Sequence, residues 1–248
     1  MKPHHLRTAP ILEAVIDIRV AGAKVTDDAE FRAVHDRVRQ DYPGIDEIRT
    51  FQATFSVDPA GTRNVAAGAK DMGSAGIRLL STDKKQIVQF RRDGYTFSRL
   101  APYTSWKRIR KESSSLWKEY LKIAQPAAAT RVALRYINKL DLPPSSQDLS
   151  DFLTTPPQLP DGIPATISGF FHRTSVDCVN GKFKGWITQA VEPSTQAGGV
   201  TVYLDFDVAR EGTIPIDDEI DATLNEIRDI KNAMFFNSVT KKTVEMYE

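Results

Sequence analysis

The stretch TRVALRYINKLDL, residues 130–142, alternates strictly between two kinds of side chain. Its charged side chains, Arg131, Arg135, Lys139 and Asp141, all fall on one side, and the other side is mainly apolar. A period of two is typical of a β-strand with one buried face. The stretch ILEAVIDIRV, residues 11–20, has the same pattern. We therefore predict a half-buried strand at the start of each half of the chain.

Similar successions of elements follow these two strands. The sequence of the first half predicts a helix capped by Asp27, then a strand over residues 48–57 and a loop over 58–76. It next predicts strands over 77–81, 86–92 and 95–100, and a helix over 105–124. The second half predicts a short helix near residues 146–153, a hairpin over 165–191 turning at Asn180-Gly181, a strand over 200–208, a helix from Asp217 to a break at Asn237-Ser238, and a last helix over 240–247.

This order predicts an α+β fold built from two fused β-α-β(3-4)-α repeats. Residues 1–124 would form the N-terminal repeat and residues 125–248 the C-terminal repeat of one compact pseudo-twofold module. Pairing of the two first strands would give one curved antiparallel sheet with the helices on one face. Because nearly every predicted strand is polar on one side, we expect the other face of the sheet to be open.

Composition limits the class of protein. The chain has 248 residues, 41% of them hydrophobic and 26% charged, as in ordinary globular proteins. No apolar run is long enough for a membrane span and no signal peptide is visible, so we expect a cytoplasmic protein without a membrane partner. The single cysteine, Cys178, excludes an internal disulfide and a cysteine-cluster zinc site.

The two halves differ in charge. Residues 1–124 contain 22 Lys and Arg against 15 Asp and Glu, and residues 125–248 contain 11 against 17. Such a difference indicates either an anionic partner for the first half or complementary halves, within one molecule or head to tail in a homo-oligomer.

Few enzymatic chemistries fit the sequence. His172 and Cys178 lie six residues apart on one predicted strand, about 20 Å, which is too far for a catalytic dyad. No Gly-Lys-Ser/Thr or His-Glu-x-x-His motif occurs, and we predict no cofactor and no metal site. Asp205 and Asp207 point the same way about 7 Å apart. With a third ligand they could support a metal-assisted hydrolase, and without one they are solvated charges.

The open face is the predicted site of function. If strand parity holds, it collects charges of both signs and aromatic rings, namely Asp17, Arg19, Arg135, Arg173, Trp186, Tyr203 and Asp205. Such a surface suits a small molecule or a protein segment, so we predict a non-enzymatic binding protein. The alternative is purely structural, in which Glu13 and Asp17 pair with Arg131 and Arg135 across the central strands.

A basic stretch offers a second functional hypothesis. Residues 84–122 are rich in Lys and Arg with aromatic residues between them, and the candidate phosphate contacts are Arg91, Arg92, Lys107, Arg108 and Lys111. This pattern is compatible with nucleic-acid binding. The alternative is an amphipathic helix whose cations form its solvated face.

Short motifs in a fixed order carry a resemblance to a known family. They are Pro10 to Ala14, Gln89 to Tyr95, Tyr103 with Trp106 and Trp117, Arg135 to Asn138, and Asn232, Phe235 and Phe236 with Thr240. Together they resemble a sporadically distributed family of uncharacterised bacterial and archaeal proteins of about this length. The resemblance implies architecture, no catalytic or ligand residues, and an association with mobile or defence loci. The predicted topology also resembles tandem-repeat ligand-binding folds such as the TATA-binding protein, although fold does not fix function.

Overall fold

The computed structural model describes residues 2–25, 27–52, 55–57, 63–65, 70–143, 148–160, 162, 167, 169–193 and 199–248. In this part of the chain nine strands form one antiparallel sheet in the order β2-β5-β6-β7-β1-β8-β11-β10-β9. The fold is therefore α+β with one large antiparallel sheet, as predicted. In sheet order the strands are β2 (Gly44–Gln52), β5 (Lys70–Leu80), β6 (Gln86–Arg91), β7 (Gly94–Leu100), β1 (Ile11–Ala21), β8 (Ala128–Leu142), β11 (Val200–Ile214), β10 (Phe183–Pro193) and β9 (Phe170–Cys178).

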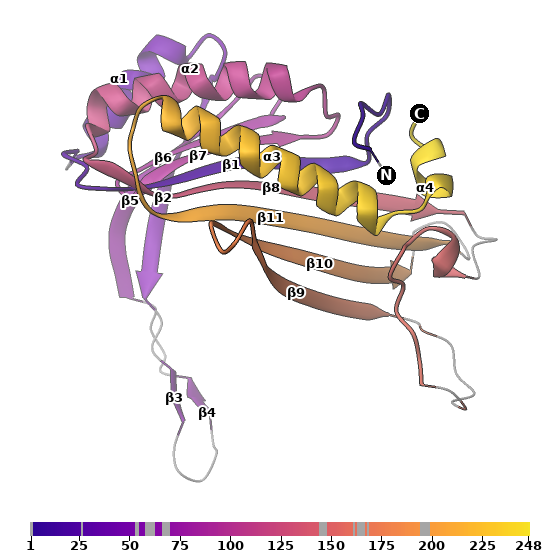
Figure 1. Cartoon of the computed structure of the whole chain (residues 1–248). Helices are drawn as coiled ribbons and strands as arrows, with labels where there is room; N and C mark the ends of the chain where they lie inside the picture. Colours follow the sequence, from indigo (N-terminus) through magenta and orange to yellow (C-terminus); the bar gives the residue numbers. More distant parts are fainter. Residues whose placement is uncertain are drawn as a thin grey trace.

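The α-helices lie over one face of this sheet (Figure 1). They are α1 (Asp28–Val38), α2 (Trp106–Ala124), α3 (Asp218–Ser238) and the short α4 (Lys241–Glu245). The side chains of Asp27, Ser105 and Asp217 cap the first three by accepting hydrogen bonds from backbone N–H groups of the first turn. No helix among the described residues has the length and apolarity needed to cross a membrane.

The two first strands are neighbours at the centre of the sheet, which confirms that prediction. β1 pairs antiparallel with β8, and Ile16 lies opposite Leu134 and Asp17 opposite Ala133. The strands of residues 1–124 lie on one side of this pair and those of residues 125–248 on the other.

The apolar side of each central strand is packed beneath the helices. Ile16 and Ile18 of β1, Leu134 of β8 and Val208 of β11 are at most 2% exposed and belong to one core cluster with Tyr120 of α2. The alternation read from the sequence therefore decides which face the helices cover, because a one-residue slip would turn every apolar side chain to the other face.

The predicted loop over residues 58–76 is wrong in its second part. Residues 70–76 belong to β5, which pairs with β2, and residues 63–65 form β4 (Arg63–Val65) opposite β3 (Phe55–Val57). Residues 58–62 and 66–69 lie outside the described part. The Gly- and Ala-rich sequence lacks alternation, but β2 supplies the cross-strand hydrogen bonds that make a strand. Figure 1 shows β2 and β5 extending beyond the sheet on the side away from the helices.

Two predicted elements of the second half are shorter in the structure. The expected helix near residues 146–153 is one 3₁₀ turn, Leu149–Asp151, capped by Asp148, and residues 146 and 147 lie outside the described part. The hairpin is confirmed, but β9 begins at Phe170, and residues 165, 166 and 168 also lie outside the described part. Asn180 and Gly181 adopt φ values of 54° and 81°, the left-handed conformation that their turn requires.

Gly94 tests the packing of the central strands. A Cβ at this position would lie 2.3 Å from the backbone oxygen of Ile18 in β1. Gly94→Ala should therefore push β7 away from β1 and lower the free energy of unfolding by about 1–3 kcal/mol, measured by urea titration. The matched control is Gly169→Ala, whose Cβ would meet its nearest atom at 3.8 Å. Equal effects of the two substitutions would contradict the close approach of β1 and β7.

Candidate functional site

All seven predicted ligand-binding residues lie on the open face, which we define as the face of the sheet opposite α1, α2 and α3. Burial alternates along β1, β8 and β11, with the helix-facing side chains buried and their neighbours partly exposed. Residues directly opposite each other in paired strands point to the same face of the sheet. Trp186 of β10 lies opposite Asp207, and Arg173 of β9 lies opposite Thr188, so both are on the open face as well.

Charges on the centre of the open face are paired with one another. Asp17 accepts a hydrogen bond from Thr96 at 2.8 Å and forms ion pairs with Arg131 at 2.9 Å and Arg91 at 3.2 Å. Arg131 also contacts Asp207 at 3.1 Å. The predicted cross-strand pairing of Asp17 with Arg131 is thus confirmed, and the group joins β6, β7, β1, β8 and β11.

The environment of Asp17 favours its charged form. Burial alone would raise the pKa of this carboxyl, but the hydrogen bond from Thr96 and the charges of Arg19, Arg91 and Arg131 together lower it. Burial raises the pKa of Asp207, and Arg131 opposes that rise only in part. Asp17 is therefore the anionic centre of the open face.

A hollow of about 230 Å³ lies farther out on the open face. Arg135 binds Asp205 there through two nitrogens, at 2.9 and 2.6 Å. The guanidinium of Arg173 lies 5.9 Å from the ring centre of Trp186, and Phe171 beside it is 72% exposed. Arg135, Arg173, Trp186 and Asp205 are therefore brought together, whereas Asp17, Arg19 and Tyr203 do not line this hollow.

The carboxylates proposed for metal-assisted hydrolysis already have cationic partners. Arg135 binds Asp205, and Arg131 binds Asp207. Within the described residues no group of three or more His, Cys, Asp or Glu side chains is placed to hold a metal ion. The third ligand that this hypothesis needs is thus not found in the described part of the chain.

The five candidate nucleic-acid contacts do not form one surface. Arg91 is 9% exposed and held on the open face, and Arg92 pairs with Asp28 at the start of α1 at 2.8 Å. Lys107, Arg108 and Lys111 lie on α2, on the other side of the sheet. The structure thus divides the basic stretch between the two sides of the sheet.

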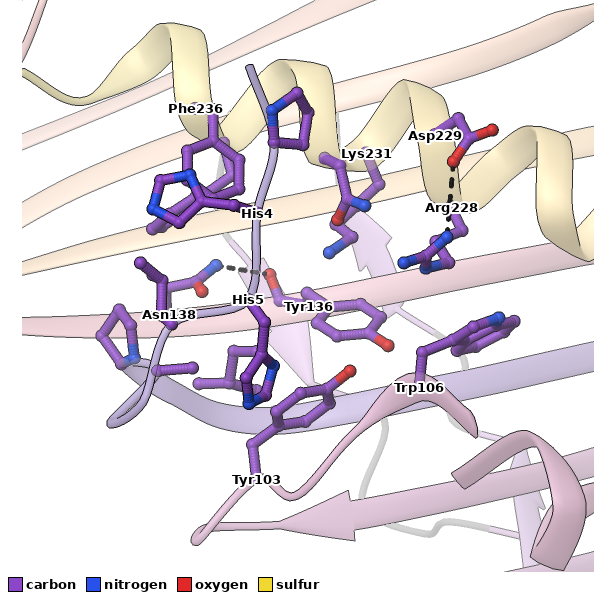
Figure 2. Close-up of a pocket in the computed structure, with 17 residues that line it drawn as sticks. His4, His5, Tyr103, Trp106, Tyr136, Asn138, Arg228, Asp229, Lys231 and Phe236 are labelled. Atoms are coloured by element: carbon purple, nitrogen blue, oxygen red, sulfur yellow. Dashed lines mark hydrogen bonds and ion pairs between the residues drawn. The ribbon is translucent and has the colours of Figure 1, made fainter. Parts of the chain in front are cut away.

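Another cavity lies on the helix side of the sheet, where the sequence predicts no site. It has a volume of about 510 Å³ and lies between α3, the start of α2, the central strands and the N-terminal segment of residues 3–11. Figure 2 shows side chains from these four regions converging on it.

Lys231 projects from α3 toward the sheet at this cavity (Figure 2). Its side chain is buried, and the residue is 8% exposed. The Nζ atom lies 3.8 Å from the ring centre of Tyr136 in β8 and has no ion pair or hydrogen bond with any residue that the structure describes. Burial, with a smaller contribution from the charge of Arg228, lowers the pKa of Lys231 to about 7. The face of the Tyr136 ring attracts the charged form and opposes this shift.

Polar groups beside the amine are already engaged. Of the described residues that line the cavity, only Asp229 carries a carboxylate, and it lies 3.5 Å from Arg228. The side-chain amide of Asn138 donates to the backbone oxygens of Leu204 and Tyr136. Burial raises the pKa of Tyr136 well above its usual value, so its hydroxyl stays protonated. The cavity therefore combines an amine that has no carboxylate partner among the described residues with neutral hydrogen-bonding groups.

The N-terminal segment closes one side of the cavity. Thr8 N donates to the backbone oxygen of Tyr247 at 3.1 Å, and Lys139 N donates to that of Pro10 at 2.8 Å. Leu6 is buried, and the His4 ring lies 5.1 Å from that of Phe236. These contacts hold the segment against α3 and the C-terminal end of the chain.

Two sequence signals pointed to this cavity without being recognised. Lys231 continues the apolar stripe of α3, four residues after Ile227 and four before Phe235, where a charged residue is unexpected. In addition, many residues that carry the family resemblance line the cavity, although they are far apart in the sequence. They are Pro10, Ile11, Tyr103, Trp106, Tyr136, Asn138, Asn232, Phe235 and Phe236.

Comparison with known proteins adds no further evidence on this site. No protein-family model matches the chain, and no curated protein was found that is similar to it. The resemblance to the family of uncharacterised proteins therefore stays a prediction.

Asp17→Asn tests the charge group of the open face. The substitution leaves Arg91 and Arg131, whose side chains are 11% and 24% exposed, without their shared carboxylate. We expect a loss of about 2–4 kcal/mol in the free energy of unfolding at pH 7 by urea titration. Because folding lowers the pKa of Asp17, this stability is present above its unfolded pKa of about 3.9 and is lost as the pH falls through the folded value.

The matched control is Asp46→Asn, which breaks a pair with Arg78 between side chains that are 48% and 47% exposed. Here the expected loss is at most about 1 kcal/mol. Similar losses for the two variants would show that the charge group has no special role in stability.

Proposed function

We propose that the protein is a binding protein that holds a small organic anion with an aromatic or apolar body in the cavity beneath α3. The observation that carries this proposal is Lys231, a buried amine without an anionic partner among the described residues, at a cavity of about 510 Å³. A buried charge without a counter-ion is costly, and a ligand carboxylate would supply that counter-ion.

The side chains that line the cavity support a ligand with an aromatic or apolar body. Aromatic and apolar side chains surround the amine, and Tyr136, Phe235 and Phe236 are at most 6% exposed. Small-molecule sites combine such apolar walls with a few polar groups that orient the ligand. In this proposal Lys231 holds the anion and the rings contact the body of the ligand.

The predicted capture of a small molecule or protein segment on the open face is a second candidate function. It is supported by the hollow in which Arg173 has no carboxylate partner among the described residues and lies over Trp186. The paired charges at the centre of the face favour a structural role there. A ligand would therefore bind near Trp186 and Arg173, and not at Asp17 and Arg19.

We also propose that residues 1–124 and 125–248 are two fused repeats. This is supported by the strand order outward from the central pair, β7-β6-β5 on one side of β1 and β11-β10-β9 on the other side of β8. A long helix, α2 or α3, follows the last of these strands in each half. α1 and β2 depart from the repeat, because the second half has only a 3₁₀ turn at the corresponding point of the chain.

Lys231→Met tests the proposed cavity site, with 2-naphthoate as a probe that joins a carboxylate to an aromatic body. We expect isothermal titration at pH 6.5 to show at least about tenfold weaker binding to this variant than to the wild type. The anion binds the charged amine, so the affinity of the wild type should fall as the pH rises above about 7. The variant should lose this pH dependence.

Lys118→Met on the exposed side of α2 is the control and should bind like the wild type. Lys231→Met should also fold, because methionine is apolar and of similar length. Between pH 7 and about 10.4 the unfolded state binds more protons at Lys231, so the wild type gains stability relative to the variant as the pH rises. Equal naphthoate affinity in the wild type and Lys231→Met would refute the assignment of this site.

Trp186→Ala tests the second candidate with phenyl phosphate, a compact dianion with one ring. If the open-face hollow binds such ligands, the variant should bind phenyl phosphate about fivefold or more weakly, because stacking against the indole is lost. Lys231→Met should leave this binding unchanged. Loss of phenyl phosphate binding in Lys231→Met but not in Trp186→Ala would assign both probes to the cavity beneath α3.

A further inference from the structure

The outer edge of β9 is the starting point of a separate inference. β9 is the last strand in the order of the sheet, and it pairs with β10 on one side only (Figure 1). In the described part of the chain no strand pairs with its other side. An edge of nine residues with free backbone N–H and C=O groups is a template for another strand unless the protein protects it.

This edge carries exposed apolar side chains and charged side chains without ion pairs among the described residues. Phe171 is 72% exposed and Val179, directly after the strand, is 56% exposed. Arg173 and Asp177 have opposite charges, and neither forms an ion pair with any described residue. Exposed apolar side chains next to unpaired charges are typical of an edge that meets a partner.

The spacing of the charged side chains allows β9 to pair with β9 of a second copy that runs in the opposite direction. In an antiparallel pair of identical strands centred on Ser175, Arg173 of each copy lies opposite Asp177 of the other. This register pairs residues 172–178 of the two copies, because Val179 lies beyond the strand in the turn, where its φ is 52°. The two charges of each copy that have no ion-pair partner among the described residues are thus placed opposite charges of the other sign.

Neighbouring registers do not give this match. Centring the pair on Thr174 places Phe171 opposite Asp177 and Arg173 opposite Ser175. Centring it on Arg173 places two guanidinium groups opposite each other, which is unfavourable. Charge complementarity therefore selects both a second copy as the partner and Ser175 as the centre.

We propose that two copies of this chain pair through their β9 edges, antiparallel and centred on Ser175, to form one continuous sheet. The proposal depends on neither candidate ligand site. It places the second copy beside the open-face hollow, because Phe171 and Arg173 line that hollow. A guanidinium has five N–H donors, so pairing of Arg173 with Asp177 of the second copy leaves donors for a ligand.

Charge reversal tests this register. We expect sedimentation velocity of the wild-type chain, from about 1 to 100 μM, to show a monomer–dimer equilibrium. Arg173→Asp and Asp177→Arg should each weaken dimerisation at least about tenfold, because each places like charges opposite each other. The double variant R173D/D177R restores both pairs with reversed signs and should return the dimerisation constant to within about threefold of the wild type.

Cross-linking gives a second measurement that does not depend on charge. In a Cys178→Ala background, Ser175→Cys should form a disulfide-linked dimer on mild oxidation, because residue 175 faces itself across the axis. Thr174→Cys should not, because it faces Val176. A monomer at every concentration, failure of the double variant to recover, or equal cross-linking at positions 174 and 175 would each overturn the proposal.

Discussion

The antiparallel pairing of β1 with β8 is the interaction on which the rest of the structure depends. Both strands are apolar on one side and charged on the other, so their pairing fixes one face for the helices and one for water. The charged side chains then meet at the centre of an otherwise open sheet. Asp17 balances Arg91 and Arg131, which come from either side of β1, and this makes the central charge group part of the architecture.

Local periodicity explains how much of the fold could be predicted. Alternation along residues 11–20 and 130–142 is a property of each strand alone. It therefore predicts the strands and the faces of their side chains, and periodicity along the whole chain predicts the order of the main elements. It failed at residues 70–76, where a Gly- and Ala-rich strand exists because β2 pairs with it. It also failed near residues 146–153, where good capping residues support only a single turn.

The candidate site was harder to predict than the fold because its parts come from distant segments. Tyr103, Tyr136 and Lys231 are each ordinary in their own elements, and they meet only after α3 packs across β8. Alternation within each strand predicts which residues lie on the open face. It gives no information about which of these residues form ion pairs with one another. Arg135 and Asp205 were therefore predicted to share a face, and their mutual ion pair was not foreseen.

Lys231 also implies a conflict between heat resistance and the anion binding that we propose. It stands in the buried stripe of α3, where an apolar side chain of the same length would avoid the desolvation of an amine. Directed evolution that selects only for thermal tolerance should therefore replace this lysine early. The evolved chains would keep the fold, the sheet and the helix intact, so assays of folding would not detect the loss of the proposed binding.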